Sequence, residues 1–497
     1  MAETKPAVIM AYRNIPYSVF ATEIEGTKKQ NFIAETNEIM GYYAIYEEGV
    51  EFSVEGSNGH YTPSKVRYKK VSDLINKEAR FLFSIPPTIT VNPNRSGMGE
   101  EEKVNNSKLN KFIGKVLKDN YFNTNLSKAA KDCFIGKRIA CMLNFNEKEG
   151  ITISFLNSTE FLYEYTGVQL SKIVAIIILS ESTNKAEQIV KKKIYEMGED
   201  GFCYVEETLY DGTGKELEEG KLERTKTKFH RIPACVIIND GLINDSKGVS
   251  DVNAISEYEA TYSKLSNSDI DAGRKCMNPI RYAIDASAES TENLSSAPGS
   301  FWDIQSDQNG SDPKNASVGM LEASMNYSGA LKVTLDRVEN SMYSQLEIPN
   351  INSEKLQGVI TSGKTLKALY WGLIVRCNEK MLTWGPAIEY IIEVILEGAQ
   401  LYPESVKKHY TESISFTNLE ILVENNYPLP EDEAEEKAVD ISEVESQTMS
   451  RKSYMKKWRN LTDEEVDEEL KQMALERQLL EDSYSMPPEG ERSDEVM

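Results

Sequence analysis

Two helical patterns separated by a polar insert constrain the fold of this chain more than any other feature. Apolar residues recur at helical spacing over residues 252–265, after a helix-capping serine at Ser250. A second pattern covers residues 331–346, and Pro349 closes it. Between them, residues 276–318 are rich in Ser, Asn, Asp, Gly and Pro around short β segments. Such an insert must lie at the far end of a helical hairpin. The narrow apolar stripes of its two helices cannot be fully buried within one chain, so we expect the chain to oligomerise.

The segments on either side of this hairpin predict an α+β protein. Residues 1–245 combine amphipathic helices with alternating segments typical of a mainly antiparallel, meandering sheet. After the hairpin, residues 363–396 predict a long helix, and Gly385-Pro386 predicts a kink in it. Residues 431–497 predict a charged, helical tail.

The formal charge of -23 is concentrated in that tail, where residues 431–497 hold 21 Asp and Glu against 9 Lys and Arg. A chain this acidic is a poor candidate for tight nucleic-acid binding, because phosphate contacts need clustered cations. It is compatible with weak contact to a moving polymer, and equally with simple solubility of a large assembly. The basic run 451–459 lies between acidic runs and favours ion pairs with neighbouring helices over contacts with DNA phosphates.

Composition also argues against common catalytic and metal sites. The six cysteines form no C-x-x-C pair, and three scattered histidines support neither a zinc site nor a catalytic triad. We therefore predict no enzyme activity, catalytic residue, cofactor or metal. The N-terminus lacks a signal-peptide pattern, and the longest apolar run, residues 173–179, is far shorter than the ~20 residues of a membrane span. The expected compartment is a reducing cytoplasm, with no membrane partner.

One short motif favours a nucleotide site. Gly358, Gly363, Lys364 and Thr365 fit the phosphate-binding signature G-x-x-x-x-G-K-[ST]. A true P-loop follows an apolar strand, whereas residues 351–357 are polar, and no later apolar strand ends in a metal-binding Asp. We therefore interpret Lys364 as a lysine in the first turn of a helix, and a P-loop NTPase stays an alternative.

The order of these segments resembles that of phage portal proteins, the head–tail connectors of long-tailed bacteriophages. Residues 71–89 resemble the family's early helix and proline turn, although many members have Gly where this chain has Ser84. Residues 109–157 are similar to its helix pair and hairpin. Ile232-Pro233 together with residues 248–271 is similar to its approach to the first stem helix. Residues 362–368, SGKTLKA, match its Ser-Gly-x-x-Leu/Ala-Lys pattern at the start of a long wing helix.

The resemblance implies a ring, typically of twelve copies, around a central channel. The expected portal fold has an α/β wing, a two-helix stem, a small β-containing clip, a long kinked wing helix and a helical C-terminal crown. The corresponding boundaries are wing 1–245, first stem helix 246–275, clip 276–318, second stem helix 319–346, tunnel loop 347–362, long wing helix and wing strands 363–430, and acidic crown with tail 431–497.

The implied function is passage of DNA rather than chemistry. The tunnel loop would face double-stranded DNA without sequence specificity, through Asn350, Asn352, Ser353, Glu354, Lys355 and Gln357. Its only charged residues are Glu354 and Lys355, with no Asp or Arg cluster. The implied partners are further copies of the chain, a large terminase motor, a head–tail adaptor, and the major capsid and scaffolding proteins. The implied location is the portal vertex of the virion, after assembly in the cytoplasm of a host bacterium. A second alternative is a virion scaffold or baseplate-type protein without a channel.

Overall fold

The computed structural model describes residues 26–53, 62–93, 99–165, 173–184, 187–211, 215–242, 245–277, 280–292, 294, 302–306, 315–321, 325–351, 367–416, 419–428, 433–459, 461 and 463–484. The chain divides into two compact units. The larger unit comprises Met1–Asn350 and Tyr370–Pro428, and the smaller one Ile351–Leu369 and Leu429–Met497.

The core of the larger unit is a three-stranded antiparallel sheet. Its order is β3 (Gly150–Asn157), β2 (Arg138–Asn146) and β9 (Ala234–Ile238). The first six residues of β2 are buried, as expected for a central strand whose apolar sequence is covered on both faces. Helices that pack on this sheet are α6 (Phe122–Gly136) and α12 (Trp371–Leu401), and α4 (Lys70–Phe83) packs on α6.

A second sheet is a five-stranded antiparallel meander, which confirms the mainly antiparallel topology expected from the sequence. Its strands follow chain order: β4 (Phe161–Tyr165), β5 (Ile173–Asn184), β6 (Glu187–Met197), β7 (Cys203–Asp211) and β8 (Glu216–Lys226). Leu179, Val190 and Tyr210 form one buried hydrophobic cluster of this sheet. The edge strand β8 is exposed and highly charged, which discourages unwanted pairing with other strands.

Segments far apart in sequence also meet in the larger unit. β1 (Thr88–Val91) pairs antiparallel with β12 (Ile421–Glu424). This unit also contains α3 (Gly26–Glu48), α5 (Glu100–Asp119) and α13 (Pro403–Val406). The polar composition of residues 92–107 predicts a loop, but α5 begins at Glu100. Three glutamates in its first turn favour a helix start there, since their charge complements the helix dipole.

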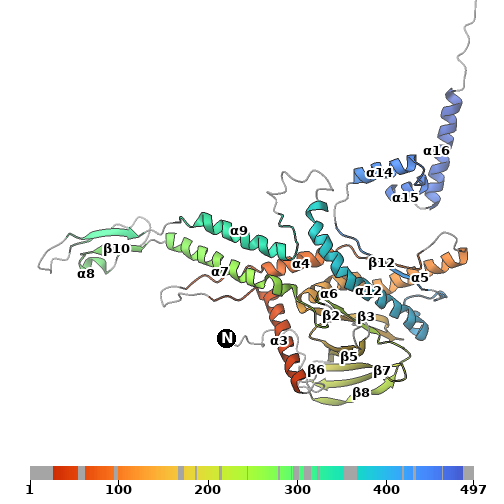
Figure 1. Cartoon of the computed structure of the whole chain (residues 1–497), viewed down its shortest axis with the longest axis horizontal. Coiled ribbons are helices and arrows are strands. Elements are labelled where there is room, and N and C mark those ends of the chain that lie inside the picture. The colour runs from red at the N-terminus through yellow and green to blue at the C-terminus, as the bar shows by residue number, and fades with distance from the viewer. Residues whose placement is uncertain are drawn as a thin grey trace, which may run out of the picture. The chain divides into compact units, whose positions relative to one another are not determined.

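The helical hairpin forms where the sequence predicts it. Figure 1 shows α7 (Asp251–Met277) and α9 (Ser328–Gln345) side by side, with β10 (Ile280–Ile284) and α8 (Ala288–Thr291) at the far end. β10 pairs antiparallel with β11 (Ser317–Leu321), and this strand runs past residue 318, where the insert is predicted to end. The functional boundary itself stays a prediction. Sequence also predicts a β segment near residues 300–304. The part described there holds only a bridge between Ala286 and Ser306.

The long predicted helix is α12. Its described turns run without interruption through Pro386 to Leu401. The predicted start at Gly363 lies outside the described residues, and α12 itself begins at Trp371.

The described residues of the smaller unit include the helices α14 (Glu433–Glu445), α15 (Arg451–Arg459) and α16 (Asp463–Tyr484). Met455 and Val466 are its buried apolar side chains among the described residues. The basic helix α15 forms ion pairs with both acidic neighbours, from Lys457 to Asp440 (2.8 Å) and from Lys452 to Asp467 (2.8 Å). The expected pairing of residues 451–459 with neighbouring helices is therefore confirmed.

Candidate functional site

The α7/α9 hairpin is the part of the described chain whose apolar surface is least completely buried by its own fold. Its apolar stripe is buried only near the base, where Val252, Ile255, Met342 and Leu346 are inaccessible to solvent. Further along the hairpin the stripe positions, including Leu265, Leu331, Leu335 and Val338, are only half-buried. The two helices therefore do not complete a core of their own over their outer turns.

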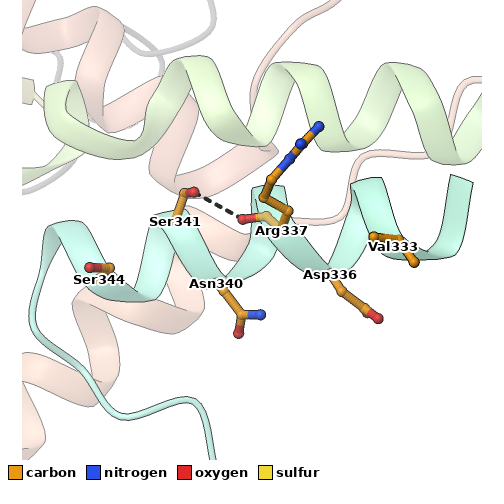
Figure 2. A pocket seen from close by; sticks show the side chains of 6 residues that line it. All are labelled: Val333, Asp336, Arg337, Asn340, Ser341 and Ser344. Carbon is orange, nitrogen blue, oxygen red and sulfur yellow. Dashed lines mark hydrogen bonds between the residues drawn. The ribbon is translucent and has the colours of Figure 1, made fainter. Parts of the chain in front are cut away.

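The outer surface of α9 carries a shallow depression of about 520 Å³. Its lining side chains all come from this one helix: Val333, Asp336, Arg337, Asn340, Ser341 and Ser344. Figure 2 shows Asp336 and Asn340 pointing to one side of the helix, and Arg337 and Ser341 to the other. Val333 is 67% exposed at one end of the depression. No second wall of this depression comes from the described part of the chain.

The far end of the hairpin exposes apolar side chains on both faces of its small sheet. Paired residues of an antiparallel ladder share a face, so the strand register assigns the faces. Tyr282 and Ile284 lie on one face, with 41% and 52% exposure. Val318 and Met320 lie on the other, with 50% and 52% exposure. An isolated two-stranded sheet is marginally stable in water, so this end also requires further contacts.

A buried network of charged side chains joins the base of the hairpin to the core. Lys380 on α12 donates to Asp251 Oδ2 (2.6 Å) and to Asn239 Oδ1 (2.9 Å), and its Nζ lies 3.1 Å from Glu78 Oε1. Arg376, one turn earlier, donates to Glu78 Oε1 and to Asp251 Oδ1, both at 2.7 Å. Two cations and two carboxylates thus balance in charge.

The burial of this network determines its electrostatics. Glu78 is fully buried on α4, and burial raises the pKa of its carboxyl although Lys380 acts in the opposite direction. Burial lowers the pKa of Lys380, but the carboxylates of Asp251 and Glu78 more than offset this, and the net shift is upward. Lys380 is therefore charged at neutral pH. Removing one member would leave a buried charge without compensation.

The network holds the first turn of α7 in place. Asp251 is the first residue of α7, and Ser250 before it accepts a hydrogen bond from the Val252 N–H (3.2 Å). The Ser250 hydroxyl also donates to the Ile135 carbonyl (2.7 Å), so the cap is anchored to α6. The sequence predicts this cap, and the structure confirms it.

Further polar contacts hold both helices of the hairpin against α4 and the segment before it. Glu259 on α7 accepts from the Val71 N–H at the start of α4 (2.6 Å), and Asn267 accepts from the Val66 N–H (2.7 Å). On α9, Glu339 forms an ion pair with Lys70 (2.7 Å). The hairpin is thus tied to the core along its inner side, and its outer side carries no such ties among the described residues.

Most of the predicted site residues lie outside the part of the chain that the structure describes. Asn350 is described, and its amide donates to Asn340 Oδ1 on the outer surface of α9 (2.9 Å). The other proposed DNA-facing residues and the P-loop match lie outside the described residues: Asn352, Ser353, Glu354, Lys355, Gln357, Gly358, Gly363, Lys364 and Thr365. Both interpretations of this loop therefore stay predictions.

Sequence reasoning missed the buried network, although one signal was present. Lys380 shares helical spacing with Leu373, Cys377 and Trp384, which form the buried stripe of α12. A lysine on an apolar stripe is rarely buried without a charged partner, so this position pointed to a hidden carboxylate. The partner Glu78, 302 positions earlier, could not be identified from spacing.

The described residues contain no cluster of side chains suited to holding a metal ion. They also contain no helix that is both long and apolar enough to span a membrane.

Comparison with known proteins agrees with the arrangement of these elements. No curated protein sequence matches this chain. A protein-family model, described as phage portal protein, SPP1 Gp6-like, matches residues 27–480 of the 497. The match includes the hairpin, the central sheet, α12 and nearly all of the described C-terminal helices. The chain therefore belongs to the SPP1 Gp6-like family of phage portal proteins.

Proposed function

We propose that copies of this chain form a closed ring at one vertex of a phage capsid. Double-stranded DNA passes through the ring without sequence specificity during packaging and ejection. The ring has twelve copies, the number that the resemblance to portal proteins implies. Residues 1–245 act as the wing, α7 and α9 as the stem, the β10/β11 end as the clip, residues 347–362 as the tunnel loop, α12 as the wing helix and residues 431–497 as the crown.

The single observation that carries this proposal is the incomplete hairpin. Its inner side is fixed to the core by the charged network, whereas its outer turns and the β10/β11 sheet leave apolar side chains half-exposed. When copies of the chain are arranged around an axis, the hairpin of each copy can cover the exposed surface of its neighbour's hairpin. Such a head-to-tail contact between different surfaces closes into a ring when the rotation from copy to copy divides a full turn evenly.

The net negative charge of the chain suits a channel that must not bind DNA tightly. At -23 per chain, a twelve-copy ring is strongly acidic, and like charge repels the DNA backbone instead of trapping it. Contacts to DNA then come from a few polar groups of the tunnel loop, including Asn350. The energy for DNA movement comes from a separate terminase motor, which docks on the clip. A head–tail adaptor docks there later.

Imaging of the purified chain tests assembly and channel together. Negative-stain micrographs and mass photometry should show rings with a central hole and a single copy number. Monomers, open filaments or assemblies without a hole would overturn the proposal and favour a scaffold or baseplate-type protein.

A nucleotide-binding measurement tests the absence of chemistry. Titration with ATP and Mg²⁺ should give no tight binding, and Lys364→Ala should behave as the unmodified chain does. Tight binding that is lost in Lys364→Ala would establish the P-loop alternative.

A further inference from the structure

The strand β9 forms an open edge of the three-stranded sheet. The carbonyl of Pro233 accepts a hydrogen bond from a β2 amide (2.9 Å), and the Asn239 N–H donates to the carbonyl of Lys137, just before β2 (2.8 Å). Ladder bonds of an antiparallel pair recur at every second residue, so the odd-numbered residues of β9 bond to β2. The N–H and C=O groups of Val236 and Ile238 therefore point away from β2, and they form no hydrogen bond with a described residue.

This edge lacks the protection that β8 has. The edge strand β8 carries many charged side chains, which discourage pairing with another chain. The sequence of β9, ACVII, contains neither a charged residue nor a proline. An apolar edge with unpaired backbone groups is a template for one more strand. The β9 edge is therefore suited to pairing with an added strand.

A groove of about 700 Å³ runs along this edge, between β9, the residues that follow it and α12. Its volume is typical of a ligand-binding pocket. Two leucines on its walls are largely exposed, Leu242 at 88% and Leu382 at 75%. The apolar lining consists mainly of Val236, Ile238, Leu242, Leu382, Pro386 and Tyr390. The groove thus offers apolar contacts to side chains and free hydrogen-bonding groups to a backbone.

The charged groups that line the groove make it acidic. Glu78 and Asp251 already neutralise its two cations, which are the network residues on α12. The carboxylates of Asp240, Asp245 and Glu379 also line it, and none of them forms an ion pair with a described residue. Asp240 only contributes from a distance to the raised pKa of the Arg376 guanidinium. The described groove and network together therefore carry a net charge of three negative units.

We propose that an extended, basic segment of a partner protein binds in this groove as an additional strand beside β9. Its backbone pairs with Val236 and Ile238, its alternate side chains contact Leu382 and the neighbouring apolar groups, and flanking Lys or Arg residues meet the acidic rim. A second copy of this chain is a poorer match, because the chain carries 79 acidic residues against 56 basic ones. The inference does not depend on the proposed ring.

Two labelled peptides test the charge and the strand geometry on the full-length chain. The basic peptide KVTVTVR alternates apolar and β-branched residues, and EVTVTVE is its acidic counterpart with the same central residues. In fluorescence anisotropy titrations the basic peptide should bind, and the acidic one should bind at least about tenfold more weakly. Hydrogen exchange with single-residue resolution should slow at the amides of Val236 and Ile238 when the basic peptide is bound.

Variants of the groove separate the backbone contact from the charge contact. Val236→Pro removes an N–H that points away from β2, which an edge strand tolerates, and should weaken peptide binding about fivefold. Val236→Ala keeps that N–H and is the matched control, with a smaller loss. Asp240→Asn/Glu379→Gln removes two rim charges and should weaken binding of the basic peptide about tenfold. Glu404→Gln, at an exposed position outside the groove, should bind normally. Circular dichroism checks that each variant folds.

Each remaining outcome overturns the proposal. Equal binding of both peptides would show that the acidic rim does not select its occupant. Binding without slower exchange at Val236 and Ile238 would exclude an added strand. If neither peptide binds, the groove is closed or already filled. If the basic peptide binds isolated chains but not their assemblies, a second copy covers the groove, and the partner assignment is wrong.

Discussion

Lys380→Met is the change that most directly tests the role of the buried network. Methionine retains much of the length and the apolar stem of lysine but removes the ammonium group. Asp251 then loses a 2.6 Å hydrogen bond, and Glu78 loses the cation that lies 3.1 Å from its Oε1. Arg376 stays, so two buried carboxylates share one cation. The larger unit acquires one uncompensated negative charge.

The size of the effect follows from burial. Breaking a buried ion pair by removing one partner costs about 3–5 kcal/mol. For a unit of roughly 400 residues, whose unfolding entropy is about 2.1 cal/mol/K per residue, a loss of about 4 kcal/mol lowers Tm by about 5 °C. We expect the larger unit of Lys380→Met to unfold at a correspondingly lower temperature.

Differential scanning calorimetry of the purified chain measures this shift, with Lys407→Met as the matched control. The Lys407 side chain is 68% exposed and pairs with Glu404 on the same short helix, so its removal should cost less than about 1 kcal/mol. If Lys380→Met and Lys407→Met have the same Tm, the network does not hold the base of the hairpin.

The same variant has a characteristic pH dependence. Lys380 is the strongest influence that opposes the burial-induced rise in the pKa of Glu78, so its removal raises that pKa further. A group whose folded pKa lies above its unfolded value contributes stability at low pH that is lost as pH rises through the folded pKa. The difference in Tm between Lys380→Met and the unmodified chain should therefore shrink as pH falls from neutral through the raised pKa of Glu78. A difference that widens on acidification would refute the charge explanation.

Three further predictions concern other parts of the chain. Burial raises the pKa of Glu35, but Arg138 and Lys247 together more than offset this rise, so the folded pKa lies below 4.5 and these ion pairs stabilise the fold above that pH. Glu35→Gln should lower the free energy of unfolding at pH 7, and urea titrations should show the deficit vanishing as pH falls through the lowered pKa; a deficit that persists in acid would contradict this. Ser250→Ala removes the cap of α7 and should cost about 1–2 kcal/mol in the same assay, with Ser250→Thr as the milder control. Trp458→Phe removes the indole hydrogen bond to Asp440 (2.7 Å) and should speed limited proteolysis of the smaller unit; an unchanged cleavage rate would show that this bond does not stabilise it.

Local patterns predicted the parts of the fold that depend on neighbouring residues. The α7/α9 hairpin follows from apolar spacing, the Ser250 cap and the polar insert, all of which act within one or two helical turns. The meander followed from strands that pair with their neighbours in sequence. The α5 start at Glu100 was missed because polar composition resembled a loop, whereas three acidic residues favoured a helix N-terminus.

The candidate site was less accessible to sequence reasoning. The P-loop match, Gly358 to Thr365, lies outside the described residues, and its role stays a prediction. The end of β11, beyond residue 318, was not predicted from composition, because a strand is defined by its partner as much as by its own residues.

By itself, then, the sequence determined that the chain has a helical hairpin with a β end, an antiparallel sheet and an acidic helical tail, in an order that resembles portal proteins. Only the tertiary structure decided what holds the hairpin. Glu78, Asp251, Arg376 and Lys380 come from three helices far apart in sequence, and they meet in one buried site. Residue spacing reports periodicity along one element, whereas a buried charge is compensated by whichever element folds against it. That is why Lys380 could be noticed in the sequence as unusual, but its partners could be named only from the fold.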